Sequence, residues 1–129
     1  FIELMPDYAL INQEVDVDGE KFKLNDILEN LNKKIKKRIG RERQIGHSYF
    51  MTEDGKPITE IKELQFVFAT DIIPLLRDYF YDSDDDLKEV LGEQFIDWNE
   101  GSDRNVMEDW QNNAEVFRTA IKKAYDVTI

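Results

Sequence analysis

One segment, residues 24–39, restricts what this chain can fold into more than any other. Its sequence is LNDILENLNKKIKKRI, and its apolar residues recur at spacings of three and four positions. These residues are Leu24, Ile27, Leu28, Leu31, Ile35 and Ile39. The spacing places them on one face of an α-helix, which must be buried against other elements. Asn25 is predicted to cap the start of this helix, and Gly40 is predicted to end it.

A second helical segment is predicted from Ile61 to Tyr81, where a broad apolar stripe runs along the sequence. Pro74 interrupts the stripe, because proline lacks an N–H group and its ring clashes with the turn before it. We therefore expect either a kink at Pro74 or two helices, with Pro74 in the first turn of the second. Nearer the C-terminus, Asn112 and Glu115 form a capping-box pattern that predicts a final helix.

The N-terminal part of the chain has strand character. Residues 1–4 are typical of a short strand that ends before Pro6. Residues 15–22 alternate around Asp18-Gly19, a dipeptide typical of tight hairpin turns. The sequence therefore predicts a mainly α fold, a small helical bundle with a short N-terminal strand and a small hairpin.

An acidic stretch, DSDDDLKEVLGE, resembles a calcium-binding loop in part. Its carboxylates at loop positions one, three, five and twelve are Asp82, Asp84, Asp86 and Glu93. Leu87 occupies the position that needs glycine for the sharp turn of such a loop. The same stretch is also predicted as a short helix over residues 83–91, capped by Ser83 and ended by Gly92. We favour the helix and predict no metal site.

Composition excludes several kinds of chemistry. The chain has 129 residues, a net charge of −11, one histidine and no cysteine. Without cysteine there is no disulfide, thiol nucleophile or cysteine-based metal site, and one histidine excludes a paired-histidine zinc site. The acidic balance argues against wrapping by nucleic acid or binding to an anionic membrane. No glycine-rich phosphate loop is present either. We expect a cytoplasmic protein without a membrane span, and no self-contained catalytic site. Because the chain begins at Phe1, we interpret it as a fragment of a larger protein.

Charge is segregated along the sequence. Seven cations lie between residues 33 and 43: Lys33, Lys34, Lys36, Lys37, Arg38, Arg41 and Arg43. Residues 78–109 are strongly acidic in contrast. The basic segment is either a surface for a partner or a phosphate, or a solvated helix end whose lysines complement the helix dipole.

The only histidine lies in the stretch QIGHSYFM, residues 44–51. Gly46 would let the backbone approach a ligand closely, and Ser48 could cap the segment that follows. His47 could donate a hydrogen bond to a phosphate or stack on a base. A lone histidine that serves only the fold is the alternative. Gly46, His47 and Ser48 are therefore the candidate ligand-contacting residues.

Three blocks of the sequence resemble the McrB-like AAA+ NTPases. FIELMPD resembles the segment that follows the arginine-rich end of the AAA+ core in that family. LNDILENLNKKIKKRIGRERQIGHSYFM and IIPLLRDYFYDSDDDLKEVLG resemble two further family patterns, in the same order. The resemblance divides the chain into residues 1–6, the end of a core strand, residues 7–92, a helical lid, and residues 93–129, a variable helical tail.

The resemblance implies a C-terminal lid that closes over ATP or GTP with Mg, held mainly by an upstream core. Family members form rings, usually hexamers, and often act with a nuclease subunit in restriction of modified DNA, so DNA would be contacted only indirectly. Gly46, His47 and Ser48 would then lie near the nucleotide, in the place of the sensor-two residue of other AAA+ lids. Tyr49 and Phe50 would pack in the lid core.

The basic residues are candidates for a contact between neighbouring subunits of the ring, facing an acidic surface of the next subunit. The candidate interface residues are Lys33, Lys36, Lys37, Arg38, Arg41 and Arg43. Catalytic residues would all lie upstream, so the fragment itself would not hydrolyse nucleotide. The alternatives are a non-catalytic acidic helical module that binds a protein partner, and a DNA contact made by the basic helix.

Overall fold

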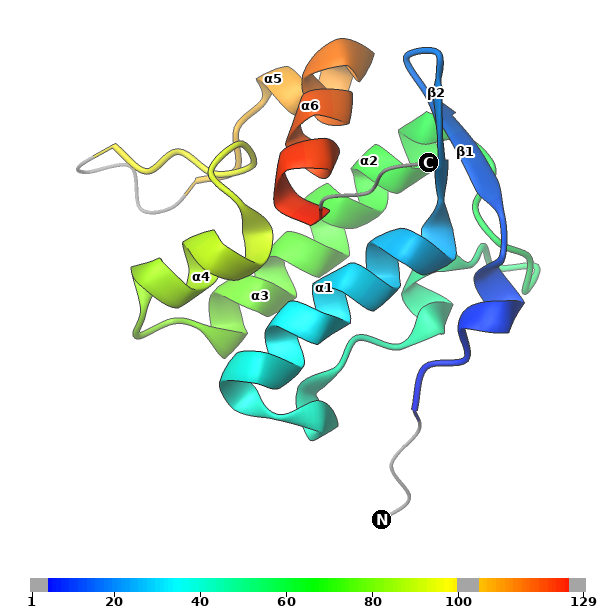
Figure 1. The fold of residues 1–129 in the computed structure, drawn as a ribbon. Coiled ribbons are helices and arrows are strands. Elements are labelled where there is room, and N and C mark those ends of the chain that lie inside the picture. The colour runs from blue at the N-terminus through cyan, green and yellow to red at the C-terminus, as the bar shows by residue number, and fades with distance from the viewer. Residues whose placement is uncertain (1–4, 100–104, 126–129) are drawn as a thin grey trace.

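A computed structural model describes residues 5–99 and 105–125 of the chain (Figure 1). The strand predicted over residues 1–4 lies outside the described residues. The fold is mainly α, as predicted, with one two-stranded antiparallel hairpin. The elements are β1 (Glu14–Val17), β2 (Glu20–Lys23), α1 (Leu24–Ile39), α2 (Ile61–Val67), α3 (Ile73–Tyr79), α4 (Asp84–Leu91), α5 (Asp109–Asn112) and α6 (Ala114–Tyr125). A short 3-10 turn at Tyr8–Ile11 precedes β1, and two more, at Arg41–Arg43 and His47–Phe50, lie between α1 and α2.

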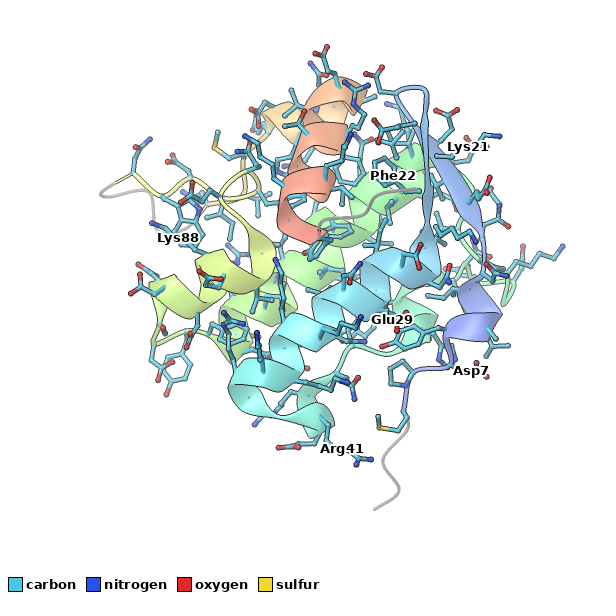
Figure 2. The ribbon with its side chains drawn as sticks, in the orientation of Figure 1. Asp7, Lys21, Phe22, Glu29, Arg41 and Lys88 are labelled. Atoms are coloured by element: carbon cyan, nitrogen blue, oxygen red, sulfur yellow. The ribbon has the colours of Figure 1, made fainter. Side chains whose placement is uncertain are left out.

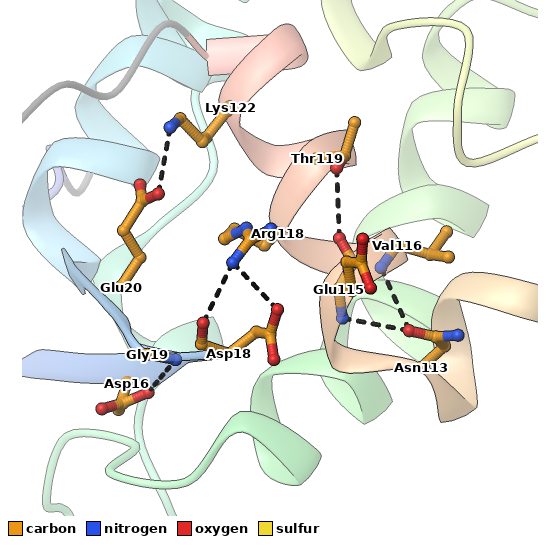
Figure 3. Close-up of polar contacts among 10 residues, drawn as sticks. All are labelled: Asp16, Asp18, Gly19, Glu20, Asn113, Glu115, Val116, Arg118, Thr119 and Lys122. Atoms are coloured by element: carbon orange, nitrogen blue, oxygen red, sulfur yellow. Dashed lines mark hydrogen bonds and ion pairs between the residues drawn. The ribbon is translucent and has the colours of Figure 1, made fainter.

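The predicted hairpin is confirmed. Its turn residues Asp18 and Gly19 both have positive φ angles, 54° and 83°, which is the backbone that two-residue hairpin turns require. Val15 pairs with Phe22 across the strands, and both side chains are buried. Figure 3 shows how α6 holds the outer part of the hairpin. Arg118 contacts the Asp18 carboxylate at 2.8 Å, and Lys122 contacts Glu20 at 3.0 Å.

Helix α1 spans the predicted residues and buries the predicted face, with Ile39 only half-buried at its end. Gly40 follows it with a φ of 97°, a conformation that favours glycine. The prediction of Asn25 as the cap was wrong. The helix begins one residue earlier, at Leu24, because β2 leads directly into it with Lys23 in the cap position. Asn25 lies inside the first turn, and its buried Oδ1 has no hydrogen-bond partner among the described residues.

The segment around Pro74 forms two helices, α2 and α3, which confirms the second of the two predicted alternatives. Pro74 lies in the first turn of α3. Between α2 and α3 the backbone stays helical but widens into a π turn over Phe68–Ile72. This wider turn lies where a regular helix would set the proline ring against the preceding carbonyl. Ser83 caps α4 as predicted, accepting a hydrogen bond from the Asp86 N–H at 3.3 Å.

The acidic stretch is a helix, which places Asp84 and Asp86 in the first turn of α4. No group of three metal-ligating side chains occurs within residues 5–99 and 105–125. The final helix exists, but the predicted cap is displaced by one residue. Asn113 caps α6, since its Oδ1 accepts hydrogen bonds from the backbone N–H groups of residues 115 and 116 at 3.0 and 3.2 Å.

A single core joins the N-terminal and C-terminal parts of the described chain. In Figure 1, α1 lies in front of α3, with α6 above it and α4 to its left. Phe68 lies at the centre of an aromatic cluster, and its ring centroid is 5.4–6.3 Å from those of its neighbours. These neighbours are Phe50, Phe95, Phe117 and Tyr125. Residues beyond 92 thus share the core of α1 and α2. No helix in the described ranges has the length and apolar character of a membrane span.

Tyr125 provides a test of this packing through pH. Its side chain is buried, its hydroxyl has no hydrogen-bond partner among the described residues, and burial raises its pKa. The unfolded tyrosine ionises near pH 10, whereas the folded one stays protonated. The contribution of Tyr125 is therefore complete below about pH 10 and falls above it, by at most about 1.4 kcal/mol per pH unit. Urea unfolding between pH 8 and 11 measures this slope.

The matched variant is Tyr125→Phe, which removes the ionisable group and keeps the ring. We expect the variant to lose less stability than the wild type between pH 10 and 11. An identical loss in both proteins would show that Tyr125 does not control the alkaline transition. Burial also raises the pKa values of Tyr8 and Tyr79, and both remain in the variant.

Candidate functional site

The loop that carries the candidate residues runs from Ile45 to Phe50 and ends in the 3-10 turn His47–Phe50. Phe50 is buried and stacks on Phe68 at 6.2 Å, as predicted for a core residue. Tyr49 does not pack in the core, since 38% of it is exposed. A 3-10 turn has about three residues per turn, so the adjacent side chains of Tyr49 and Phe50 point in different directions, and here only Phe50 faces the core.

A buried asparagine in α1 fixes the start of this loop. Asn32 is fully buried, and its Nδ2 donates to the Ile45 carbonyl at 3.0 Å. The Ile45 N–H donates to Asn32 Oδ1 at 2.8 Å. The side-chain amide thus pairs with both polar groups of one backbone residue, as a neighbouring strand would. Asn32 Nδ2 also donates to the Tyr8 hydroxyl at 3.1 Å. One side chain therefore joins α1, the loop and the N-terminal segment.

His47 makes a second connection between the loop and the N-terminal segment. The Asp7 backbone N–H donates to His47 Nδ1 at 2.9 Å. A ring nitrogen that accepts a hydrogen bond carries no proton, so the neutral ring has its proton on Nε2. No partner for Nε2 occurs among the described residues. His47 is half-buried and keeps this N–H group as a donor.

Gly46 and Ser48 lie on either side of His47 in the loop. Gly46 has extended backbone, with φ −74°, which any residue adopts. A Cβ added there would meet only the Ser48 hydroxyl, at 3.9 Å, so the space beside it is open. Ser48 does not cap the turn, because it lies within the turn and Gly46 occupies the cap position. Its side chain is exposed.

The basic segment is partly engaged within the chain. Arg38 pairs with Asp86 at 3.6 Å and with Glu89 at 3.3 Å, both on α4. Arg43 lies over the Tyr79 ring, 5.6 Å from its centroid.

Lys34 is half-buried and donates to the Ala124 carbonyl, whereas Lys33, Lys36, Lys37 and Arg41 are exposed. Arg41 Nη2 is 3.8 Å from Met5 Sδ. Lys33, Lys36 and Lys37 are exposed and form no ion pair in the described part of the chain. Helix α4, which lies within the acidic stretch 78–109, therefore already pairs with Arg38 of its own chain.

Sequence reasoning missed the two residues that hold the loop. Asn32 lies on the apolar face of α1, between Leu28 and Ile35, and a polar residue in that position is the signal that could have revealed its role. Asp7 acts through its backbone N–H, and no side-chain pattern could have indicated it.

The fold and the loop define a small helical domain whose described part holds no cluster of metal-ligating side chains. A family model described as the McrB alpha-helical lid domain matches residues 23–88, just over half of the chain, and the chain belongs to this family. The match begins at the end of β2 and ends within α4, so α5 and α6 lie outside it. No curated protein matches the chain significantly.

Proposed function

We propose that this domain is the lid of a McrB-like AAA+ NTPase and that it closes over ATP or GTP with Mg bound by an upstream core. The observation that carries the proposal is the family match over residues 23–88. The loop geometry supports it. Residues 7 and 8 would follow the core directly, and both are hydrogen-bonded to the group formed by the loop and Asn32. If the loop moves when nucleotide binds, these hydrogen bonds would transmit the movement to the connection between the core and the lid.

In this proposal His47 replaces the arginine of other AAA+ lids as the nucleotide contact. Its Nε2–H group is the donor, and Nδ1 is occupied by the Asp7 N–H. A neutral donor suits a ribose or base oxygen, and Gly46 leaves open space beside it. The domain would work in a ring with neighbouring subunits in the cytoplasm, in restriction of modified DNA together with a nuclease subunit. Lys33, Lys36 and Lys37 are the cations best placed to reach a neighbouring subunit.

The test separates the two nitrogens of His47 in the full-length NTPase. In His47→Asn, the asparagine Oδ1 is attached to Cγ as Nδ1 is, so it can still accept from the Asp7 N–H, but the outer donor is lost. We expect nucleotide affinity to fall about three- to tenfold, the effect of one hydrogen bond, with lid stability nearly unchanged. His47→Ala should lower both. Nucleotide titration and thermal unfolding measure the two effects.

Three results would contradict parts of the proposal. Unchanged nucleotide affinity in both variants would remove His47 from the site. Nucleotide-independent hydrogen exchange at residues 46–48 of the full-length protein would mean that the loop does not meet the nucleotide. Turnover by the 129 residues alone would overturn the assignment of catalysis to an upstream core.

A further inference from the structure

A groove of about 710 Å³ lies between α2 and the turn that follows the candidate loop. Its apolar lining consists of Met51, Ile58, Phe66 and Val67. Phe66, the penultimate residue of α2, is 66% exposed although it is a large aromatic residue. A second hollow of about 320 Å³ is lined by Phe66 from its other side and extends to α5. Phe66 therefore stands as a ridge between two hollows, where an apolar side chain of a partner could pack on either face.

The rim of the groove is acidic. Its charged residues are Glu53, Asp54, Lys62, Glu63 and Asp71. In the described part of the chain none of the four carboxylates forms an ion pair, in contrast to Asp86 and Glu89 on α4. The net charge of −11 attracts a cationic partner at long range. At the groove itself, four carboxylates and one lysine favour contacts with cationic side chains.

The groove is preformed. On one side, Ile58 is buried, and its N–H donates to the Phe50 carbonyl at 3.0 Å. The turn above it is closed by a hydrogen bond of 2.7 Å from the Thr52 N–H to the Lys56 carbonyl. On the other side, Asp71 belongs to the π turn that separates α2 from α3. π turns of this kind are frequent at functional sites.

We propose that this groove docks a cationic polypeptide segment of a partner protein, with an apolar side chain of that segment packed against Phe66. The four carboxylates of the rim favour a cationic segment as the occupant, and a second copy of this chain, whose residues 33–43 are also basic, is the other occupant that the test distinguishes. This docking function goes beyond the nucleotide-dependent role of the lid and does not require nucleotide.

The other exposed aromatic residue in an acidic setting serves as a matched control. Tyr81 is 76% exposed and lies beside Asp82, Ser83, Asp84 and Asp85. No aliphatic side chain lines that hollow. The hollow beside Tyr81 is acidic but has no aliphatic lining, so it should attract a cationic peptide without favouring one that carries leucines.

The experiment titrates the 129-residue chain with two synthetic peptides and follows backbone amide shifts by NMR. Both peptides carry six lysines. One has two leucines at its centre, and the other has serines in their place. We expect the leucine peptide to bind about tenfold more tightly, the effect of burying one leucine side chain, and to shift the amides of residues 51–54 and 62–71. Phe66→Ser should abolish that advantage, whereas Tyr81→Ser should leave it unchanged.

Charge is tested by the double variant Glu53→Lys, Asp54→Lys, which should weaken both peptides at least tenfold. Because all these side chains are exposed, thermal unfolding should be unchanged, which separates lost binding from lost folding. Equal affinity of the two peptides, or shifts centred on residues 81–85, would overturn the proposal. Concentration-dependent shifts at residues 51–54 and 62–71 without peptide would also overturn it, because the occupant would then be a second copy.

Discussion

Replacing Asn32 with leucine is expected to lower the free energy of unfolding by about 2–4 kcal/mol, although leucine would complete the apolar face of α1. The substitution removes both partners of the Ile45 backbone, the donor at 3.0 Å and the acceptor at 2.8 Å. Each buried polar group left without a partner costs about 1–3 kcal/mol, which exceeds the gain from additional apolar surface. Urea denaturation followed by circular dichroism measures the difference.

The matched control is Asn25→Ala in the same helix. The Asn25 Oδ1 is already buried without a hydrogen-bond partner among the described residues, so its removal breaks no hydrogen bond there. Alanine also has the higher helix propensity. We therefore expect this variant to be as stable as the wild type or slightly more stable. If Asn32→Leu were equally harmless, the buried amide would not hold the loop.

The Asn32→Leu variant also tests the candidate site, because Asn32 holds the backbone of Ile45. Ile45 directly precedes Gly46 and His47, so the loop should become mobile before the whole domain unfolds. Hydrogen exchange at the Ile45 amide should accelerate more in Asn32→Leu than at amides in the centre of α6. Uniform acceleration at all amides would indicate global destabilisation only.

Periodicity predicted the parts of this fold in which one face of an element is buried. The span of α1, the hairpin at Asp18-Gly19, the cap at Ser83 and the helical break at Pro74 all follow from local rules. The predicted caps were displaced, by two residues at α1, where β2 leads directly into the helix with Lys23 in the cap position, and by one residue at α6, where Asn113 and not the adjacent Asn112 accepts the N–H hydrogen bonds.

The candidate site was predicted less completely, for a different physical reason. The pattern around His47 identified the loop, but the Asp7 N–H and the Asn32 amide that orient it come from distant parts of the sequence. Contacts between positions 7 and 47, or 32 and 45, have no local signature. The groove beside Phe66 could not be predicted from the sequence either. An apolar residue at this position of α2 is compatible with a buried or an exposed side chain, and only the structure shows that Phe66 is exposed.

The C-terminal segment beyond the family match should prove essential for the stability of the domain. Trp110 is fully buried, its ring stacks on Phe117 at 5.7 Å, and it meets Phe95 edge-on at 5.1 Å. Its Nε1–H donates to the Phe95 carbonyl at 3.0 Å, and its own carbonyl accepts from the buried Gln65 at 2.9 Å. Trp110→Ala is expected to cost about 3–5 kcal/mol, through the cavity and the lost hydrogen bond.

The other tryptophan provides the control for this prediction. Trp98 is only half-buried, lies under the Lys88 ammonium at 5.0 Å, and has an indole N–H without a hydrogen-bond partner among the described residues. Trp98→Ala should therefore cost less than about 2 kcal/mol, since it loses partial burial and one cation–π contact. Urea unfolding monitored by far-ultraviolet circular dichroism compares the two variants without relying on tryptophan fluorescence. Equal, small losses for both would mean that α5 and α6 add little to the core formed by the matched residues. A loss of about 3–5 kcal/mol for Trp110→Ala alone would mean that the lid needs this segment as part of its own core.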